Sequence, residues 1–208
     1  MLKQLRQMLF RPSDPKMIRV GGEQFEASLL VPVIKGTGLV KTGHDKIYMV
    51  GEPWEMLPLG FDLTGDLAVL LAINLPRTLH FLSNASALDS GLAAVDLLEL
   101  AKKNLAKLSS TIRITEDGPI GFRIQLDGNL DASLLLYDDL WDQFEKLVGG
   151  TPLVVIPHRS MLFGCCAETE GAADYLLSKV RDFDPNVRHV VSKNLFVRQD
   201  RAWRLYTN

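Results

Sequence analysis

Two apolar runs on either side of a short polar turn constrain the fold of this chain more than any other feature. The runs cover residues 153–156 and 161–165, and the turn between them is Pro157-His-Arg-Ser160. Short apolar runs bounded by turn residues are typical of buried strands. The turn therefore holds three side chains capable of chemistry at the mouth of a buried sheet. The candidate ligand-binding residues are His158, Arg159 and Ser160.

The composition predicts a folded globular protein and narrows its partners. The chain has 208 residues, of which 47% are hydrophobic, and this is ample material for a core. A formal net charge of −2 leaves no basic excess to displace counterions from phosphates, so nucleic acid is not an expected partner. The longest apolar run, Leu67 to Ile73, is far shorter than the roughly 20 residues of a membrane helix, so no membrane association is expected.

The only two cysteines, Cys165 and Cys166, are adjacent and cannot form a disulfide framework. The first ten residues have no apolar core of an export signal, and together these features predict the cytoplasm. A vicinal disulfide or a share in a soft-metal site is the alternative for this pair. Zinc needs three or four converging ligands, for which the sequence has no motif, so we expect no metal. The glycine-rich segment 36–42 has Val40 where a phosphate loop needs glycine, so we expect no nucleotide or other cofactor.

The first half of the chain predicts short strands and one long helix. A short amphipathic helix is expected over 2–10, and extended runs predict strands at 17–20, 25–34, 46–50, 66–74 and 78–82. A helix near 92–108 follows, because apolar residues recur on one face. The predicted buried face consists of Ala94, Leu98, Ala101, Leu105 and Leu108. Asn104 lies beside this face, and we expect its amide to tie the helix to a neighbouring loop or strand.

The second half contains clearer turn signals. Two acid-glycine turns separate alternating runs and predict an antiparallel meander of 110–115, 120–126 and 130–136. A helix beginning at Asp138 is expected to bury Leu140, Trp141, Phe144, Leu147 and Val148, with its acids Asp138, Asp139 and Asp142 facing water. Further predicted elements are the strands around the polar turn, a helix over 170–181, a strand at 187–191, and a hairpin of 195–198 with 202–206.

These elements predict an α+β fold with an antiparallel or mixed sheet and packed helices, in one domain over 1–208. The segment from Phe25 to Val31 parallels that from Leu130 to Leu136, and both halves contain a strand, an Arg-Thr or Arg-Ser turn, a second strand and a helix. These two similarities within the sequence lead to the hypothesis of an internal repeat with halves of about 15–108 and 110–208. Chance likeness between apolar strands is the alternative.

Several segments in the last two thirds of the chain match a known family in order and spacing: 62–67, 100–105, 132–136 with Trp141, 154–159, and 195–198 with Trp203. On these segments, from about Asp62 to Tyr206, the chain resembles the YtpQ-like family of uncharacterised bacterial proteins. The resemblance implies a bacterial cytoplasmic protein and implies no activity. The family pattern places an acid after the arginine, where this chain has Ser160, so a carboxylate-dependent mechanism at the turn is not expected.

The polar turn supports three interpretations. Its guanidinium, imidazole and hydroxyl groups suit an anionic ligand. Ser160 as a nucleophile requires a histidine base and an orienting carboxylate, and adjacent residues on an extended turn point apart, which makes His158 a poor base for it. His44, His80 or His189 would then have to supply the base. In a purely structural role, Arg159 pairs with an acid such as Asp138 or Asp139.

The function that these observations favour is that of a binding or interaction protein without catalytic activity, because no complete catalytic set is present. Its expected partner is an unknown protein or a small anionic ligand, and the oligomeric state is left open. The alternative is a small hydrolase or phosphate-ester enzyme centred on the turn from Pro157 to Ser160.

Overall fold

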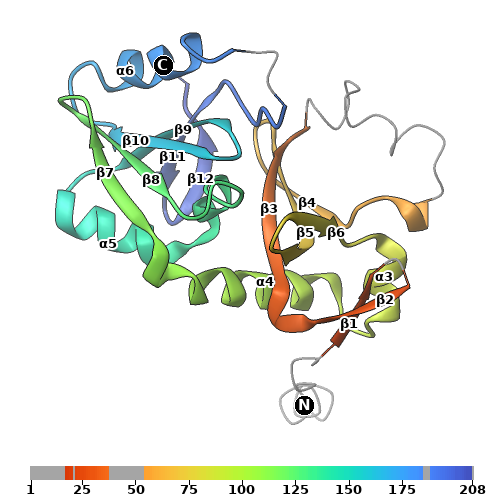
Figure 1. Ribbon diagram of the computed structural model, residues 1–208. Coiled ribbons are helices and arrows are strands. Elements are labelled where there is room, and N and C mark those ends of the chain that lie inside the picture. The colour runs from red at the N-terminus through yellow and green to blue at the C-terminus, as the bar shows by residue number, and fades with distance from the viewer. Residues whose placement is uncertain (1–16, 21, 38–53, 185–187, 208) are drawn as a thin grey trace, which may run out of the picture.

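A computed structural model describes residues 17–20, 22–37, 54–184 and 188–207 of the chain. Its helices and antiparallel sheets confirm the α+β class (Figure 1). The described strands form one sheet of two strands, one of four and one of six. The predicted helix over 2–10 and the predicted strand at 46–50 lie outside the described residues.

The four-stranded sheet is built around β5 (Leu67–Leu75), the long apolar run. β3 (Leu30–Gly36) pairs along one edge of β5, from Leu30 opposite Ile73 to Gly36 opposite Leu67. β4 (Gly60–Thr64) and β6 (Thr78–Phe81) follow one another along the other edge. Since β5 has neighbours on both edges and a core on each face, an uninterrupted apolar run suits it.

Helices and a small hairpin cover one face of this sheet. The hairpin consists of β1 (Met17–Val20) and β2 (Glu23–Glu26), and the helical elements are η3 (Trp54–Met56), α3 (Asn84–Asp89) and α4 (Ala94–Lys107). Ile18, Leu71 and Leu97 belong to the core that they share. α3 begins at a helix cap in which the hydroxyl oxygen of Ser83 accepts from the backbone N–H of Ser86.

The buried face of α4 differs from the predicted one. Ala101 and Leu105 are buried as expected, but Leu97 and Leu100 are buried as well, while Leu98 and Leu108 are only partly covered. Asn104 explains the shift, because it lies in the middle of the buried face. Its amide nitrogen donates to the carbonyl oxygens of Ala27 and Leu30, both at 2.9 Å, which confirms the predicted tie to a neighbouring segment.

The six-stranded sheet has the order β12, β11, β9, β10, β8, β7. Its strands are β7 (Arg113–Asp117), β8 (Gly121–Gln125), β9 (Pro152–His158), β10 (Met161–Cys166), β11 (Leu195–Gln199) and β12 (Ala202–Leu205). The predicted runs around the polar turn and the predicted closing hairpin are thereby confirmed. Each neighbouring pair is antiparallel, and β9 lies inside the sheet between β10 and β11.

α5 (Asp138–Val148) and α6 (Ala172–Arg181) cover opposite faces of this sheet (Figure 1). Side chains alternate along β9: Val154 packs in the same core as Trp141 of α5, and Val155 packs in the same core as Leu176 of α6. The polar turn at the end of β9 is therefore held by a strand with a core on each face.

Several predicted elements differ in the structure. Residues 132–136 form the 3-10 helix η5 (Ala132–Leu136) instead of a third strand of the meander, and the predicted strand over 25–34 is interrupted by the 3-10 helix η1 (Ala27–Leu29). The expected strand at 187–191 is reduced, among its described residues, to one bridge between Val190 and His158. Leu147 and Val148 are exposed, because they lie on the outer side of the last turn of α5.

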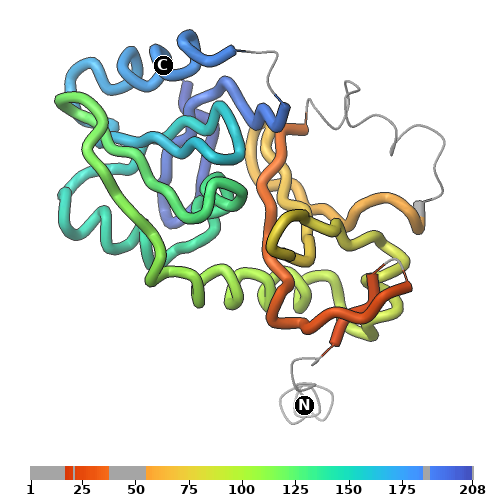
Figure 2. The backbone as a smooth tube through the Cα atoms, in the orientation of Figure 1, coloured from red at the N-terminus to blue at the C-terminus, as the bar shows by residue number. Residues whose placement is uncertain are grey.

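The two larger sheets lie side by side, with β3 along their boundary (Figure 2). The core that contains Trp141 also contains Ile34 of β3 and Leu67 of β5. The backbone N–H of Ile34 donates to Ser133 at 3.3 Å, and the Ser192 hydroxyl donates to Asp66 at 2.7 Å. Apolar packing and hydrogen bonds therefore both cross the boundary.

The segments 25–31 and 130–136, which parallel each other in sequence, share a local conformation. Ala27–Leu29 and Ala132–Leu136 are both 3-10 helices, and the alanine of each is buried. The following elements differ, because β3 continues the first segment and α5 continues the second. Duplication of a unit over about 15–108 in residues 110–208 stays a prediction.

Candidate functional site

The polar turn joins β9 to β10 and is anchored by two other segments. Its ends are His158 and Met161, which lie opposite each other. The carbonyl oxygen of Arg159 accepts from the N–H of Ala132 at 3.0 Å, and the N–H of Arg159 donates to the carbonyl of His189 at 3.2 Å. These bonds hold the backbone of the turn in place and thereby restrict the positions that its side chains can take.

His158 and Ser160 lie in direct contact, contrary to the expectation that they point apart. The hydroxyl oxygen of Ser160 lies 2.7 Å from Nδ1 of His158, and the backbone N–H of Ser160 donates to the same nitrogen at 3.2 Å. The contact arises because the turn folds the serine back over the imidazole. Extended geometry does not apply within a two-residue hairpin loop.

These contacts also fix the tautomer of the imidazole. Nδ1 accepts a backbone N–H and therefore carries no proton, so Nε2 carries the proton and donates to the carbonyl oxygen of Arg188 at 2.8 Å. The ring is further flanked by Phe183 and His189, with ring centroids at 5.8 and 6.1 Å. The basic nitrogen of His158 thus faces the hydroxyl of Ser160.

Burial lowers the pKa of His158, and the positive charges of Arg159 and Lys35 lower it further. The hydrogen bond to Arg188 and the negative charge of Asp131 oppose this lowering without cancelling it. The imidazole is therefore neutral at pH 7, with Nδ1 available to accept a proton.

Arg159 forms no ion pair with any acid among the described residues. Its Nε atom is buried and has no hydrogen-bond partner there. The expected pairing with Asp138 or Asp139 is wrong, because Asp138 pairs with Arg198 instead. The positive charge at the turn is thus left without an acidic partner in the described part of the chain.

Asp131 is a fully buried acid next to the turn, and sequence reasoning missed it. One carboxylate oxygen accepts three backbone N–H groups, those of Leu126, Asp127 and Gly128, at 2.9–3.1 Å. The other oxygen is buried without a partner in the described residues. The spacing Asp127-Gly-Asn-Leu-Asp131 was the available signal, since acids and glycine at such intervals form compact hydrogen-bonded loops.

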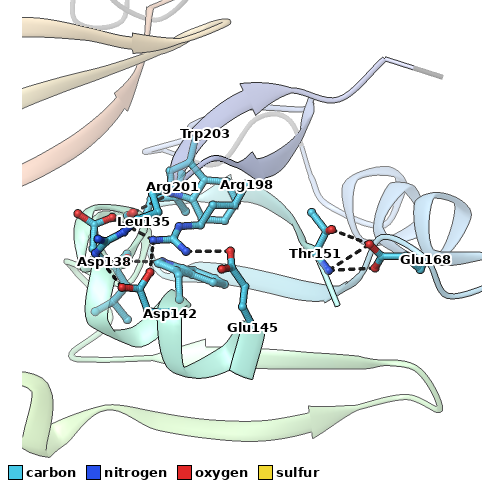
Figure 3. A network of polar contacts seen from close by, with 11 residues as sticks. Leu135, Asp138, Asp142, Glu145, Thr151, Glu168, Arg198, Arg201 and Trp203 are labelled. Carbon is cyan, nitrogen blue, oxygen red and sulfur yellow. Dashed lines mark hydrogen bonds and ion pairs between the residues drawn. The ribbon is translucent and has the colours of Figure 1, made fainter. Parts of the chain in front are cut away.

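The acids of α5 form ion pairs with a different arginine. The guanidinium of Arg198 donates to Glu145 at 2.8 Å, to Asp142 at 2.7 Å and to Asp138 at 3.3 Å, although its side chain is 0% exposed (Figure 3). Arg201 reaches the second oxygen of Asp142 at 2.7 Å. Asp138 faces water as expected, with 52% of its side chain exposed, whereas Asp142 is only 26% exposed because it lies between the two arginines.

This network is a structural element of the core. Burial lowers the pKa of Arg198, but its hydrogen bonds to Asp142 and Glu145 outweigh this, so the pKa is raised. Above it, the indole nitrogens of Trp141 and Trp203 donate to the carbonyls of Leu134 and Leu135, both at 2.8 Å. Both terminal nitrogens of Arg198 are directed at α5, and its Nε is buried without a partner among the described residues.

The adjacent cysteines show no sign of chemistry. Both are free thiols, and burial raises the pKa of Cys165 to about 12. Burial also raises the pKa of Cys166. A thiol becomes reactive when its pKa is lowered, and the burial of these two residues acts in the opposite direction. No group of three His, Cys, Asp or Glu side chains able to hold a metal occurs in the described part of the chain. Of the glycine-rich segment 36–42, only its first two residues are described, and Gly36 belongs to β3.

Fold and site together define an α+β protein with an anchored polar hairpin turn. The chain is similar to bacterial proteins that are named only UPF0354 proteins. Those of Staphylococcus aureus strains JH9, Newman and USA300 are each 26% identical to it over 141 residues, or 67% of this chain and 46% of theirs. The chain thus spans about half the length of the curated relatives it matches. These relatives support kinship with an uncharacterised bacterial family.

No family model matches the chain, and no solved structure matches it. Among the described helices, none is both long and apolar enough to cross a bilayer.

Proposed function

We propose that this protein is a binding protein that receives a small anionic ligand at the turn formed by His158, Arg159 and Ser160. We also propose that it is a cytoplasmic member of the YtpQ-like family. The relatives supply no activity to carry over, so the proposal depends on the site.

The observation that carries the proposal is the different environment of two arginines. Arg198 is buried and pairs with three acids. A buried cation is tolerated when such partners compensate its loss of contact with water. Arg159 lies partly buried at an anchored turn and forms no ion pair with an acid among the described residues. The Nε atoms of both arginines are buried without a partner there, so the difference between them lies in the acids. A guanidinium in the position of Arg159 suits a carboxylate or phosphate, which it can bind through two parallel hydrogen bonds.

The neighbouring groups agree with an anion. The turn also contributes the hydroxyl of Ser160, which lies 2.7 Å from Nδ1 of His158, and the positive charge of Lys35 is near enough to lower the pKa of His158. Asp131 is the opposing charge, but three backbone N–H groups already stabilise its carboxylate.

Binding of inorganic phosphate, sulfate and succinate to the full chain tests the proposal by titration calorimetry. We expect Arg159→Ala to weaken binding of the best of these anions by about tenfold or more, because a charge-assisted hydrogen bond contributes roughly 1.5–3 kcal/mol. Arg77→Ala is the matched control, since Arg77 is an exposed arginine in the corresponding hairpin between β5 and β6. It should leave binding unchanged.

Two results would overturn the proposal. One is that none of the three anions binds the wild-type chain. The other is that Arg159→Ala lowers the melting temperature by many degrees while the remaining folded protein binds the anion as before. The second result would instead make Arg159 a structural partner of the buried Asp131.

A further inference from the structure

We propose that Ser160 is a nucleophile that His158 activates, and that it is acylated by esters that carry a negative charge. The inference rests on the proposed function, because Arg159 holds the charged part of the ester. It goes beyond that function by assigning a covalent step to the same turn.

The geometry provides a nucleophile and its base. A serine hydroxyl attacks a carbonyl only when a neighbouring group takes its proton, and the Ser160 oxygen lies 2.7 Å from the unprotonated Nδ1 of His158. The opposite nitrogen is anchored on the carbonyl of Arg188 at 2.8 Å, which holds the ring in place. Neither His158 nor Ser160 is fully buried, so an ester can reach the pair.

Charges around the pair act on the imidazole in both directions. Asp131, Arg159 and Lys35 are the charged groups that act on the imidazole, and His189 and Phe183 flank its ring. The negative charge of Asp131 stabilises the imidazolium that forms when the serine loses its proton. Burial, and after it the positive charges of Arg159 and Lys35, lower the pKa of His158 and so keep Nδ1 unprotonated and able to accept a proton, although as a weaker base than a free histidine.

The chemical step is balanced without any further reagent. The Ser160 oxygen forms a bond to the carbonyl carbon of the ester while its proton passes to Nδ1 of His158. The bond from that carbon to the leaving alcohol then breaks, and the alkoxide takes the proton from His158. The products are an acyl-serine and an alcohol.

The positive charge of Arg159 favours esters that carry a negative charge as the substrate class. The backbone N–H of Ser160 is occupied by His158, so positive charge at the turn comes from side chains. Arg159 is the preceding residue, and Arg123 donates to the backbone carbonyl of Ser160 at 3.4 Å. An ester with a carboxylate or phosphate a few bonds from its carbonyl would place that anion on Arg159 and its carbonyl at Ser160.

Labelling of the full chain with a fluorophosphonate probe, followed by peptide mass spectrometry, tests the nucleophile. We expect an adduct on Ser160, no adduct at this position in Ser160→Ala, and labelling about a hundredfold slower in His158→Gln. Ser28→Ala is the control, because the hydroxyl of Ser28 contacts a carboxylate and not a histidine. It should leave labelling of Ser160 unchanged.

The pH dependence of labelling provides a test that needs no variant. The rate should rise as His158 loses its proton and reach a plateau, with a midpoint below the ordinary histidine value near 6.5, because the pKa of His158 is lowered. Absence of a Ser160 adduct, or a rate that does not change over this range, overturns the proposal.

The ester class is tested with the nitrophenyl esters of propionate and succinate, which differ by one carboxylate. Acylation should be faster with the succinate ester, and Arg159→Ala should lose this preference while Arg77→Ala keeps it. Equal rates in the wild type would overturn the assignment of charged esters. Loss of anion binding in Arg159→Ala without any labelling of Ser160 would leave the proposed function standing and this inference refuted.

Discussion

Arg198 lies on β11 with its guanidinium pressed against α5, where three acids share one helix face. Asp138, Asp142 and Glu145 recur at intervals of four and three residues, and this spacing places them in a row. A fully buried cation is tolerated here because the three acids accept hydrogen bonds from its guanidinium. Arg201 contacts the same Asp142 from solvent, so the two arginines form a matched pair.

At this scale we predict unequal effects of two substitutions. Arg198→Met should lower the free energy of unfolding by about 3 kcal/mol, because it removes the charge-assisted hydrogen bonds of a buried cation and leaves three neighbouring acids without it. Arg201→Met, whose arginine side chain is 65% exposed, should produce no measurable change. Urea denaturation of both variants measures the difference. A similar loss in both, or in neither, would contradict the structural role assigned to Arg198.

Helices and strands differ in how far the sequence predicts them. The runs flanking the turn were predicted nearly to the residue, because proline and polar residues stop them and an apolar core covers both faces. The sequence predicts a strand over 130–136, where the structure has a 3-10 helix. The apolar side chains of this helix fill the core, and a short apolar run does not distinguish a buried strand from a buried 3-10 helix. At the site, the residue types were predictable, but the contact between His158 and Ser160 depends on the local path of the turn, and the proximity of Asp131 depends on tertiary structure.

A prediction at the scale of elements concerns α4. Leu105 is 1% exposed and Val95 of the same helix is 59% exposed. Leu105→Ala should cost about 2–5 kcal/mol, because it removes a buried side chain and leaves a cavity. Val95→Ala should leave the denaturation midpoint nearly unchanged. Equal midpoints for the two variants would show that the helix packs with another face.

For the whole molecule, the boundary between the two larger sheets is closed at Gly36. A methyl group added there would overlap the backbone carbonyl oxygen of Val191, which cannot move without breaking the bond from its N–H to Pro157. The end of β3 can therefore approach the second half of the chain only because this residue has no side chain. The segment that contains Val191 also contacts the polar turn, because Val190 forms a bridge with His158.

Gly36→Ala should consequently destabilise the whole chain by about 2 kcal/mol or more, because the overlap forces backbone atoms apart. Gly60→Ala is its control in the same sheet, since the added methyl there meets mainly the flexible end of the Leu70 side chain, at 2.8 Å. Thermal unfolding followed by circular dichroism compares the two. If Gly36→Ala is no less stable than Gly60→Ala, the boundary is looser than the structure indicates.

The inside position of β9 determines what a shortened chain would do. Its partner on one edge, β11, comes from far along the sequence, after α6. A chain cut between α6 and Leu195 would keep β9 and its buried side chains but would leave the backbone of Leu153–Val155 without the strand that pairs with it. Such an open apolar edge recruits strands from other molecules. Insoluble aggregates, formed by intermolecular strand pairing, are therefore the expected fate of such fragments.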